Sequence, residues 1–460
     1  MNKNVVRRVL CVVRRNQDAR RQTPETPSGF WTFPASRHPI TLNLWPGRID
    51  GFRTIPSGFG VFMSSAFLFV YALVALFSAS NAIRRPSPPS SRFPALWLPA
   101  VLVAEIPWFW FLLRIVVSGG FVAVGAHHLP IGRLGMLILA IAQVLQLELI
   151  RRAGASAREV GPGRSAAAWW EKITGWPYRI PEGIERTAEI EYGTGLTLDV
   201  YRPRGPRTEA VPCLVYVHGG SWGGGDPRRV FRTVVHHLAS QGWGVVTIRY
   251  PLSPNATFPD HVVGVNRALH WVKTSGAEAF GLDPDRIALA GGSAGAHLAS
   301  LAVLSNGDHQ PGFESADTSV RAAVVLYGIY DFFNRNNTRV NWPLIPNRVM
   351  KAAMADAPDR YRQASPIDQV REDAPPFLVI HGTSDSLVPI AEAEFFVDAL
   401  RTAGAPVEFL RVHRAQHAFD ILGGVRTRAL AVRIEHFLIS NLSETATDSL
   451  PSDAHRPEAA

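Results

Sequence analysis

The chain has 460 residues, a length that allows one large domain with additional sequence or two domains. Its formal net charge is +9, and 10 of its 47 lysines and arginines lie within the first 53 positions. These basic residues form no stripe on an amphipathic helix and accompany no nucleic-acid-binding motif, so we expect no nucleic-acid partner.

The first 57 residues form a basic segment without clear periodicity. The segment is rich in proline, arginine and glycine, a composition that indicates a disordered tail. The sequence that begins at Met63 would also suit the N-terminus of a protein, so a second interpretation is that translation begins at Met63. Any peptide from residues 1–60 in mass spectra of the native protein would exclude the later start.

Three apolar stretches between residues 58 and 152 predict a transmembrane region with about three spans. The first carries no charge over about 20 residues, enough for a helix to cross a hydrocarbon core of about 30 Å. The second contains Glu105 and Arg114, and we expect it to form one tilted span that is kinked at Pro107. The three stretches are Gly60–Ala79, Ala95–Ala126 and Leu134–Ile150.

Two alternatives to a membrane region are a cleaved signal peptide and buried helices of a soluble domain. A signal peptide would leave the second and third stretches unexplained, and the first has no clear small-residue cleavage site. Arginines that follow the first and third stretches favour a cytoplasmic C-terminal domain, whereas the basic N-terminal segment favours the opposite orientation. These arginines are Arg84, Arg85, Arg92, Arg151, Arg152, Arg158 and Arg164.

Residues 176–440 alternate short apolar β-rich runs with longer helical ones, after a linker at 153–175. The apolar runs are nearly continuous, as in strands covered by helices on both faces, so a mostly parallel α/β sheet is expected. Residues 188–193 and 196–203 predict an antiparallel pair at its edge. Residues 334–372 interrupt the alternation where a lid could be inserted, and 441–460 have the composition of a disordered tail.

The run "GGSAG" at 291–295 follows a predicted strand and precedes a predicted helix. Gly-x-Ser-x-Gly in this context is typical of a nucleophile elbow, where Gly291 and Gly295 leave room for a sharp turn and Ser293 stands at its apex. The alternatives are a glycine-rich strand–helix turn and a phosphate-binding loop. The run contains neither Gly-x-Gly-x-x-Gly nor Gly-Lys-Ser/Thr, which argues against a nucleotide-binding loop.

A second glycine-rich run, "HGGSWGGGD" at 218–226, follows an earlier predicted strand. In hydrolases with a nucleophile elbow, one oxyanion-hole N–H comes from the residue after the nucleophile and another from such a loop. The predicted donors are therefore Gly219, Gly220 and Ala294, with Ser221 as a further possibility, and we expect His218 to anchor the loop.

A nucleophilic serine needs a base and an orienting carboxylate, in the chain order Ser, acid, His. Asp385 follows one late predicted strand and His417 follows the last, so Ser293, Asp385 and His417 are the predicted catalytic residues. Asp331 is the rival acid and His413 the rival base.

The remaining histidines, including His127 and His128, form no spaced ligand set with carboxylates, so we expect no metal and no cofactor. The two cysteines, Cys11 and Cys213, lie in surroundings too different to indicate a disulfide or a cysteine-based metal site.

With these motifs, residues 180–440 resemble the α/β-hydrolase superfamily, in particular the hormone-sensitive-lipase-like and BD-FAE-like esterases and the membrane-bound prenylcysteine methylesterases. The resemblance includes "RYPLSPNATFPD", "LDPDRIALAGGSAGAHLA", "VIHGTSDSLVP" and "QHAFD". It implies the same triad and oxyanion hole. Ser221 replaces the third glycine of the usual His-Gly-Gly-Gly, so a preference for esters of tertiary alcohols is not implied, and Arg249 replaces an aspartate.

The function expected from these features is that of a membrane-anchored serine carboxylesterase or lipase acting on a small-molecule or lipid-like ester. Two alternatives stay open. The first is an amide hydrolase on the same fold, either an arylformamidase or a peptidase, and the second is a non-catalytic membrane scaffold. Comparison of ester and amide substrates separates the enzymes, and a fluorophosphonate probe separates both from the scaffold.

Overall fold

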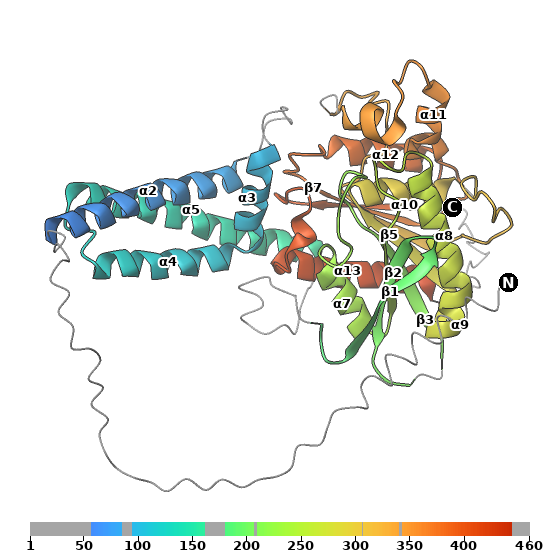
Figure 1. Cartoon of the computed structure of the whole chain (residues 1–460), viewed down its shortest axis with the longest axis horizontal. Helices are drawn as coiled ribbons and strands as arrows, with labels where there is room; N and C mark the ends of the chain where they lie inside the picture. The colour runs from blue at the N-terminus through green and yellow to red at the C-terminus, as the bar shows by residue number, and fades with distance from the viewer. Residues whose placement is uncertain are drawn as a thin grey trace, which may run out of the picture.

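The structure is a computed structural model that describes residues 57–84, 94–161, 180–206, 209–305, 307–339 and 343–443. A group of N-terminal helices extends to one side of an α/β domain (Figure 1). The predicted tails at 1–57 and 441–460 lie almost wholly outside the described residues, as does most of the predicted linker.

The α/β domain is built on one eight-stranded sheet, in the order β1-β2-β4-β3-β5-β6-β7-β8. β1 pairs with β2, and β2 with β4, in antiparallel fashion, whereas all pairs from β4 to β8 are parallel. The predicted mostly parallel sheet and its antiparallel edge are thus confirmed. The strands are β1 (Ile184–Gly193), β2 (Leu196–Pro203), β3 (Val211–Val217), β4 (Gly244–Ile248), β5 (Leu282–Gly292), β6 (Ala322–Leu326), β7 (Phe377–Gly382) and β8 (Val407–Val412).

Helices cover both faces of this sheet, so its central strands are apolar on both sides. In β3, Val215 and Val217 belong to one core cluster, while Leu214 and Tyr216 belong to the other. The first cluster includes residues of α8 (Asp260–Trp271), α10 (Ala294–Leu304) and α12 (Ala391–Thr402). The second includes residues of α7 (Arg232–Ser240) and α13 (Val425–Leu442).

The segment expected to hold a lid contains short helical turns after β6. Ile345 and Val349 in this segment are buried in the domain core, which shows that part of it is packed into the fold. Its function as a lid stays a prediction. The short elements of the domain are η1 (Val272–Gly276), α9 (Ala277–Phe280), η2 (Ile345–Met350), α11 (Pro358–Gln363), η3 (Pro366–Gln369) and η4 (Phe419–Ile421).

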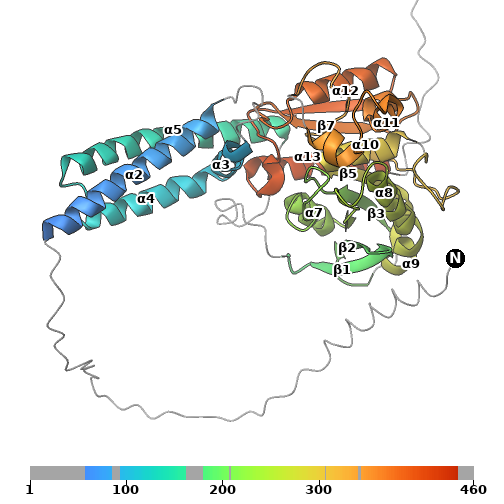
Figure 2. The ribbon, with the colours of Figure 1, turned by 45° about the horizontal axis from the view of Figure 1, so that its top comes forward.

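Among the described residues, four helices precede the α/β domain, and the long ones run side by side away from it (Figure 2). Two of the four are long and apolar enough to cross a membrane, and a bent pair raises the number to three if it counts as one span. The helices are α2 (Ser57–Ile83), α3 (Pro94–Glu105), α4 (Pro107–Ala123) and α5 (Pro130–Val160).

The second predicted span is not the single kinked helix that we expected. α3 and α4 meet at an angle of 91°. Pro107 has no N–H to continue the helix and restricts the backbone of Ile106, which adopts a non-helical conformation. The Trp110 indole N–H bonds the Leu102 carbonyl oxygen across this bend (3.0 Å). As a result α3 lies beside the α/β domain rather than within the group of long helices.

α5 is longer than the apolar stretch that predicted it and continues through residues assigned to the linker. Its last turns reach the α/β domain, where Val160 is buried in the same core cluster as α13 residues. The apolar stretch in the sequence had indicated only the part of α5 that lies within the predicted membrane region.

Candidate active site

Ser293 stands at the turn between β5 and α10, in a conformation that L-residues rarely adopt (φ 56°, ψ −121°). The turn is so tight that a Cβ atom on Gly291 would lie 2.2 Å from the Gly295 carbonyl oxygen, and one on Gly295 would lie 2.0 Å from the Val217 carbonyl oxygen. Both positions therefore require glycine. The geometry is that of the nucleophile elbow expected from the sequence.

The structure brings together the three residues of the predicted triad. The Ser293 Oγ lies 3.0 Å from His417 Nε2, and His417 Nδ1 lies 2.7 Å from Asp385 Oδ2. Asp385 follows β7, and His417 lies between β8 and α13, so three separate loops meet at the carboxyl edge of the sheet. Both distances allow hydrogen bonds, and the arrangement can pass a proton from the serine to the imidazole.

The Asp385 side chain is fully buried and is held as a carboxylate. The backbone N–H groups of Leu387 and Val388 donate hydrogen bonds to its Oδ1 at 2.9 and 2.8 Å. Burial raises the pKa of Asp385, but the charge of His417 and hydrogen bonds from His381 and His417 outweigh this effect, and the pKa falls to about 2. The carboxylate is thus ionised at neutral pH and suited to orient an imidazole.

His381 is a neighbour of the site that sequence reasoning missed. It is fully buried at the end of β7, and its Nε2 lies 2.8 Å from the Val388 carbonyl oxygen and 3.2 Å from Asp385 Oδ2. It therefore contacts the same carboxylate oxygen, Oδ2, that His417 Nδ1 approaches to 2.7 Å. Its place in the "VIHGTSD" run, four residues before Asp385, was the available signal.

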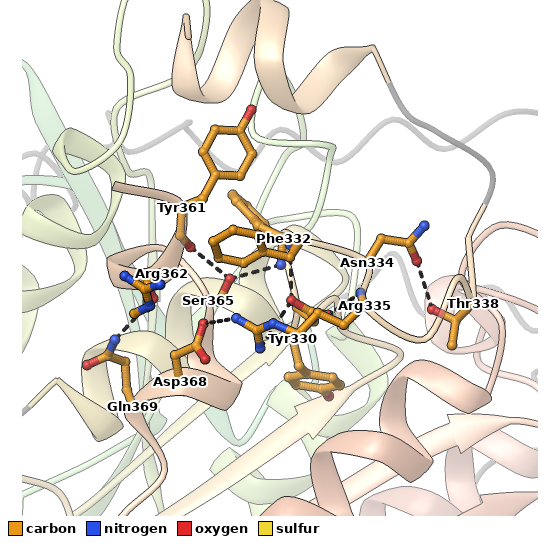
Figure 3. A network of polar contacts seen from close by, with 12 residues as sticks. Tyr330, Phe332, Asn334, Arg335, Thr338, Tyr361, Arg362, Ser365, Asp368 and Gln369 are labelled. Atoms are coloured by element: carbon orange, nitrogen blue, oxygen red, sulfur yellow. Dashed lines mark hydrogen bonds and ion pairs between the residues drawn. The ribbon is translucent and has the colours of Figure 1, made fainter. Parts of the chain in front are cut away.

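The two rival residues, Asp331 and His413, make contacts away from Ser293 and His417. Asp331 accepts hydrogen bonds from the backbone N–H groups of Phe333 (3.0 Å) and Arg335 (2.7 Å), so both carboxylate oxygens shape the loop after β6. Figure 3 shows this loop tied to the segment of α11 and η3, where the Phe332 N–H bonds Ser365 Oγ at 3.0 Å. His413 is exposed and lies 3.6 Å from the Glu159 carboxylate.

The predicted oxyanion loop passes directly over the serine. A Cβ atom on Gly219 would lie 3.1 Å from the Ser293 Cβ, so the backbone there is close enough to contact a substrate carbonyl. The loop is anchored by stacking of the buried His218 ring on Tyr250 (4.6 Å between centroids) and by a hydrogen bond from the Tyr250 hydroxyl to the His218 carbonyl oxygen (3.2 Å). Burial lowers the pKa of His218, which favours its neutral form.

A buried tyrosine packs against the His417 imidazole and bonds a buried aspartate. No local sequence pattern had indicated this pair. The Tyr327 ring packs 4.7 Å from the His417 ring, between centroids. Its hydroxyl donates a hydrogen bond to Asp420, which is buried three residues after His417. Burial raises the pKa of Asp420.

The described residues contain no group of three or more His, Cys, Asp and Glu side chains that could hold a metal ion. The side chains gathered around Ser293 offer a nucleophile, a base, an acid and nearby backbone amides. Such a set is suited to acyl transfer.

Comparisons with known proteins identify the family to which the chain is related. The BD-FAE family matches residues 198–400. The probable carboxylic ester hydrolase LipM of Mycobacterium tuberculosis is 36% identical over 390 residues, which cover 78% of this chain and 89% of LipM. The esterase LipQ of the same organism is 42% identical over 261 residues, which cover 55% of this chain and 62% of LipQ.

A solved structure has the same fold in its α/β domain. A truncated form of a carbohydrate esterase from gut microbiota matches 56% of this chain and 96% of its own, with a TM-score of 0.50 and 23% identity. The likeness to LipM extends over most of both chains and confirms the resemblance expected from the motifs. This chain therefore belongs to the α/β-hydrolase family of carboxylic ester hydrolases.

Proposed function

We propose that this protein is a membrane-anchored serine carboxylesterase or lipase that cleaves acyl esters of lipid-like or other apolar compounds. Ser293 is the nucleophile, His417 the general base and Asp385 the carboxylate that orients the imidazole. The observation that carries this proposal is the pair of short contacts that joins Asp385 to His417 (2.7 Å) and His417 to Ser293 (3.0 Å).

The reaction proceeds through an acyl-enzyme. The Ser293 Oγ attacks the ester carbonyl carbon while its proton passes to His417 Nε2, and the tetrahedral intermediate collapses as the alcohol takes that proton and leaves. Water then attacks the acyl-serine with His417 again as base, and the carboxylic acid is released. Asp385 stays ionised throughout and stabilises the imidazolium, in keeping with its pKa of about 2.

The backbone N–H groups of Gly219, Gly220 and Ala294 form the oxyanion hole in this proposal. Ala294 begins α10 directly after the serine, and Gly219 lies so near that a Cβ atom added to it would be 3.1 Å from the Ser293 Cβ. Each donor of this kind typically contributes about 3 kcal/mol to transition-state stabilisation.

A fluorophosphonate probe on the detergent-solubilised full chain tests the nucleophile. The wild-type protein should be labelled at Ser293, and Ser293→Ala should abolish labelling while leaving the melting temperature close to that of the wild type. A wild-type protein that resists labelling beside an active control hydrolase would contradict the serine mechanism, and labelling of the variant would mean that another residue is the nucleophile. Esters of increasing chain length, compared with matching amides, then define the substrate class.

The exposed apolar surface of the N-terminal helices supports membrane anchoring. Among the described residues, the exposed large hydrophobic side chains lie in this part of the chain, apart from Met354 and Ile439. They project from α2, α3, α4 and α5, as Phe67, Leu98, Val116 and Leu137 illustrate. A surface of this extent is expected to contact lipid. Extraction of native membranes with alkaline carbonate should leave the protein in the membrane fraction, and its release would contradict the anchor.

We also propose that residues 58–152 form the membrane domain and 176–440 the catalytic domain, which faces the cytoplasm. Arg151 and Arg152 lie at the end of α5 that approaches the catalytic domain, and Arg152 donates a hydrogen bond to the Ile83 carbonyl oxygen at the end of α2 (3.1 Å). Arginines near this end of the helices favour a cytoplasmic location for that end and for the catalytic domain that follows it. A protease added to intact cells should leave the catalytic domain uncut. Digestion of the catalytic domain would contradict the proposed orientation.

A further inference from the structure

α3 contacts the loop that carries the active-site histidine. The Trp97 indole N–H donates a hydrogen bond to the His417 carbonyl oxygen (3.0 Å). The two rings also lie edge to face, with centroids 6.3 Å apart. One side chain from the apolar helices therefore contacts both the backbone and the ring of the residue that is the base in the proposed mechanism.

The C-terminal end of α3 contacts the C-terminal end of the same loop, where α13 begins. Arg426 Nη1 lies 2.8 Å from Glu105 Oε1, and both side chains are about 2% exposed or less. The chain approaches so closely there that a Cβ atom on Gly424 would lie 2.3 Å from the Glu105 carbonyl oxygen. Because removal of one partner from such a buried pair is strongly destabilising, this contact keeps α3 seated on the start of α13.

The α/β domain itself holds the residues just before the histidine. The Ser384 N–H bonds the Ala415 carbonyl oxygen (3.0 Å), and Ser386 Oγ bonds Gln416 Oε1 (2.9 Å). From His417 onward the chain leaves these contacts and turns through Ala418, which has a left-handed conformation (φ 53°). The Trp97 bond thus adds a contact from α3 at His417 itself, between the residues held by the loop after β7 and Asp420, which Tyr327 holds.

We propose that Trp97 is a positioning residue for His417, so that the apolar helical region completes the active site of the esterase. This inference rests on the proposed function, since it concerns the base of the Ser293–His417–Asp385 triad. A general base must stay within about 3.2 Å of the proton that it takes, and a misplacement of about 1 Å can lower a rate about a hundredfold. The indole bond limits this movement only while α3 is seated.

Trp97→Phe removes the N–H donor and keeps an aromatic ring. Trp110→Phe is the matched control, because it removes an indole bond of the same length to a backbone carbonyl, that of Leu102, away from the active site. The detergent-solubilised full chain is assayed with p-nitrophenyl butyrate. We expect Trp97→Phe to lower kcat about three- to tenfold, as the loss of one partly buried hydrogen bond implies, with KM and the melting temperature little changed. Trp110→Phe should stay within about twofold of the wild-type kcat.

The outcomes separate this inference from the proposed function. Wild-type kcat in Trp97→Phe, or an equal loss in Trp110→Phe, overturns the positioning role even if Ser293→Ala still abolishes fluorophosphonate labelling. A rise in KM alone also overturns it, because it would assign Trp97 to substrate binding. Failure of the wild-type protein to react with the probe overturns the proposed function and, with it, this inference.

Discussion

Gly292 is the one glycine of the elbow whose identity the Gly-x-Ser-x-Gly pattern leaves open, and Gly292→Ala tests the reason that the structure supplies. A Cβ atom there would lie 2.9 Å from the Tyr327 hydroxyl and 3.3 Å from the Tyr216 hydroxyl. Tyr327 has little freedom to move, because its hydroxyl bonds the buried Asp420. The added methyl group must therefore displace Tyr327.

The cost of this substitution follows from two contributions. Overpacking of a tight core typically costs about 1–3 kcal/mol. Loss of the Tyr327–Asp420 hydrogen bond, which leaves a buried carboxyl group without its donor, adds about 1–3 kcal/mol. Together the two contributions amount to about 2–6 kcal/mol. For a domain of this size, each kcal/mol lowers the melting temperature by about 2–4 °C, so we expect a decrease of about 4–24 °C.

A double-mutant cycle isolates the steric contact. Tyr327→Phe removes the hydroxyl group that the new methyl would meet, so Gly292→Ala should cost about 1 kcal/mol less in the Tyr327→Phe background. Thermal unfolding of the solubilised chain, followed by tryptophan fluorescence, measures each variant. Gly183→Ala is the control, since a Cβ atom there meets no other atom within 4 Å. Additivity of the two substitutions within about 0.5 kcal/mol would refute the proposed contact.

Two further predictions concern Asp385. Asp385→Asn should lower kcat in an ester assay about 1,000- to 10,000-fold, because the amide no longer holds His417 in the reactive tautomer. His413→Ala should change kcat less than about twofold. Equal losses of kcat in the two variants would mean that the base is misassigned. The pKa of Asp385 lies at about 2, below its usual value of 3.8. Its carboxylate therefore stabilises the folded state fully above about pH 4. This stabilisation is of order 2 kcal/mol and is lost as the pH falls through 2. Unfolding measured at pH 5 and pH 2.5 should therefore show a smaller decrease in stability for Asp385→Asn than for the wild-type protein, and equal decreases would contradict the lowered pKa.

The candidate triad could be predicted because each of its members lies just after a recognisable strand. Ser293 is marked by flanking glycines, Asp385 and His417 by their positions after apolar runs, and the order of the three residues excludes most rivals. In the structure, the carboxylate of the rival Asp331 accepts two backbone hydrogen bonds and shapes a turn, while the assignment of Asp385 as the acid stays a prediction.

The bend at Pro107 shows where local pattern was insufficient. An apolar stretch with one proline is compatible with a kinked span and with two separate helices, because hydropathy reports composition and not direction. The contact of Glu105 with Arg426 accompanies the second arrangement, in which a charged residue of the apolar stretch is buried against α13.

By itself, the sequence determined the alternation of strands and helices, the elbow at Ser293 and the apolar lengths of the N-terminal helices. These features depend on residue spacing within one segment, where backbone geometry and side-chain periodicity act directly. Only the tertiary structure decided that Trp97 meets His417, that Tyr327 and Asp420 support the imidazole, and that Gly292 must be small. Trp97 and His417 are 320 positions apart in the chain, and such contacts arise when separately formed elements pack together, a result that no local pattern encodes.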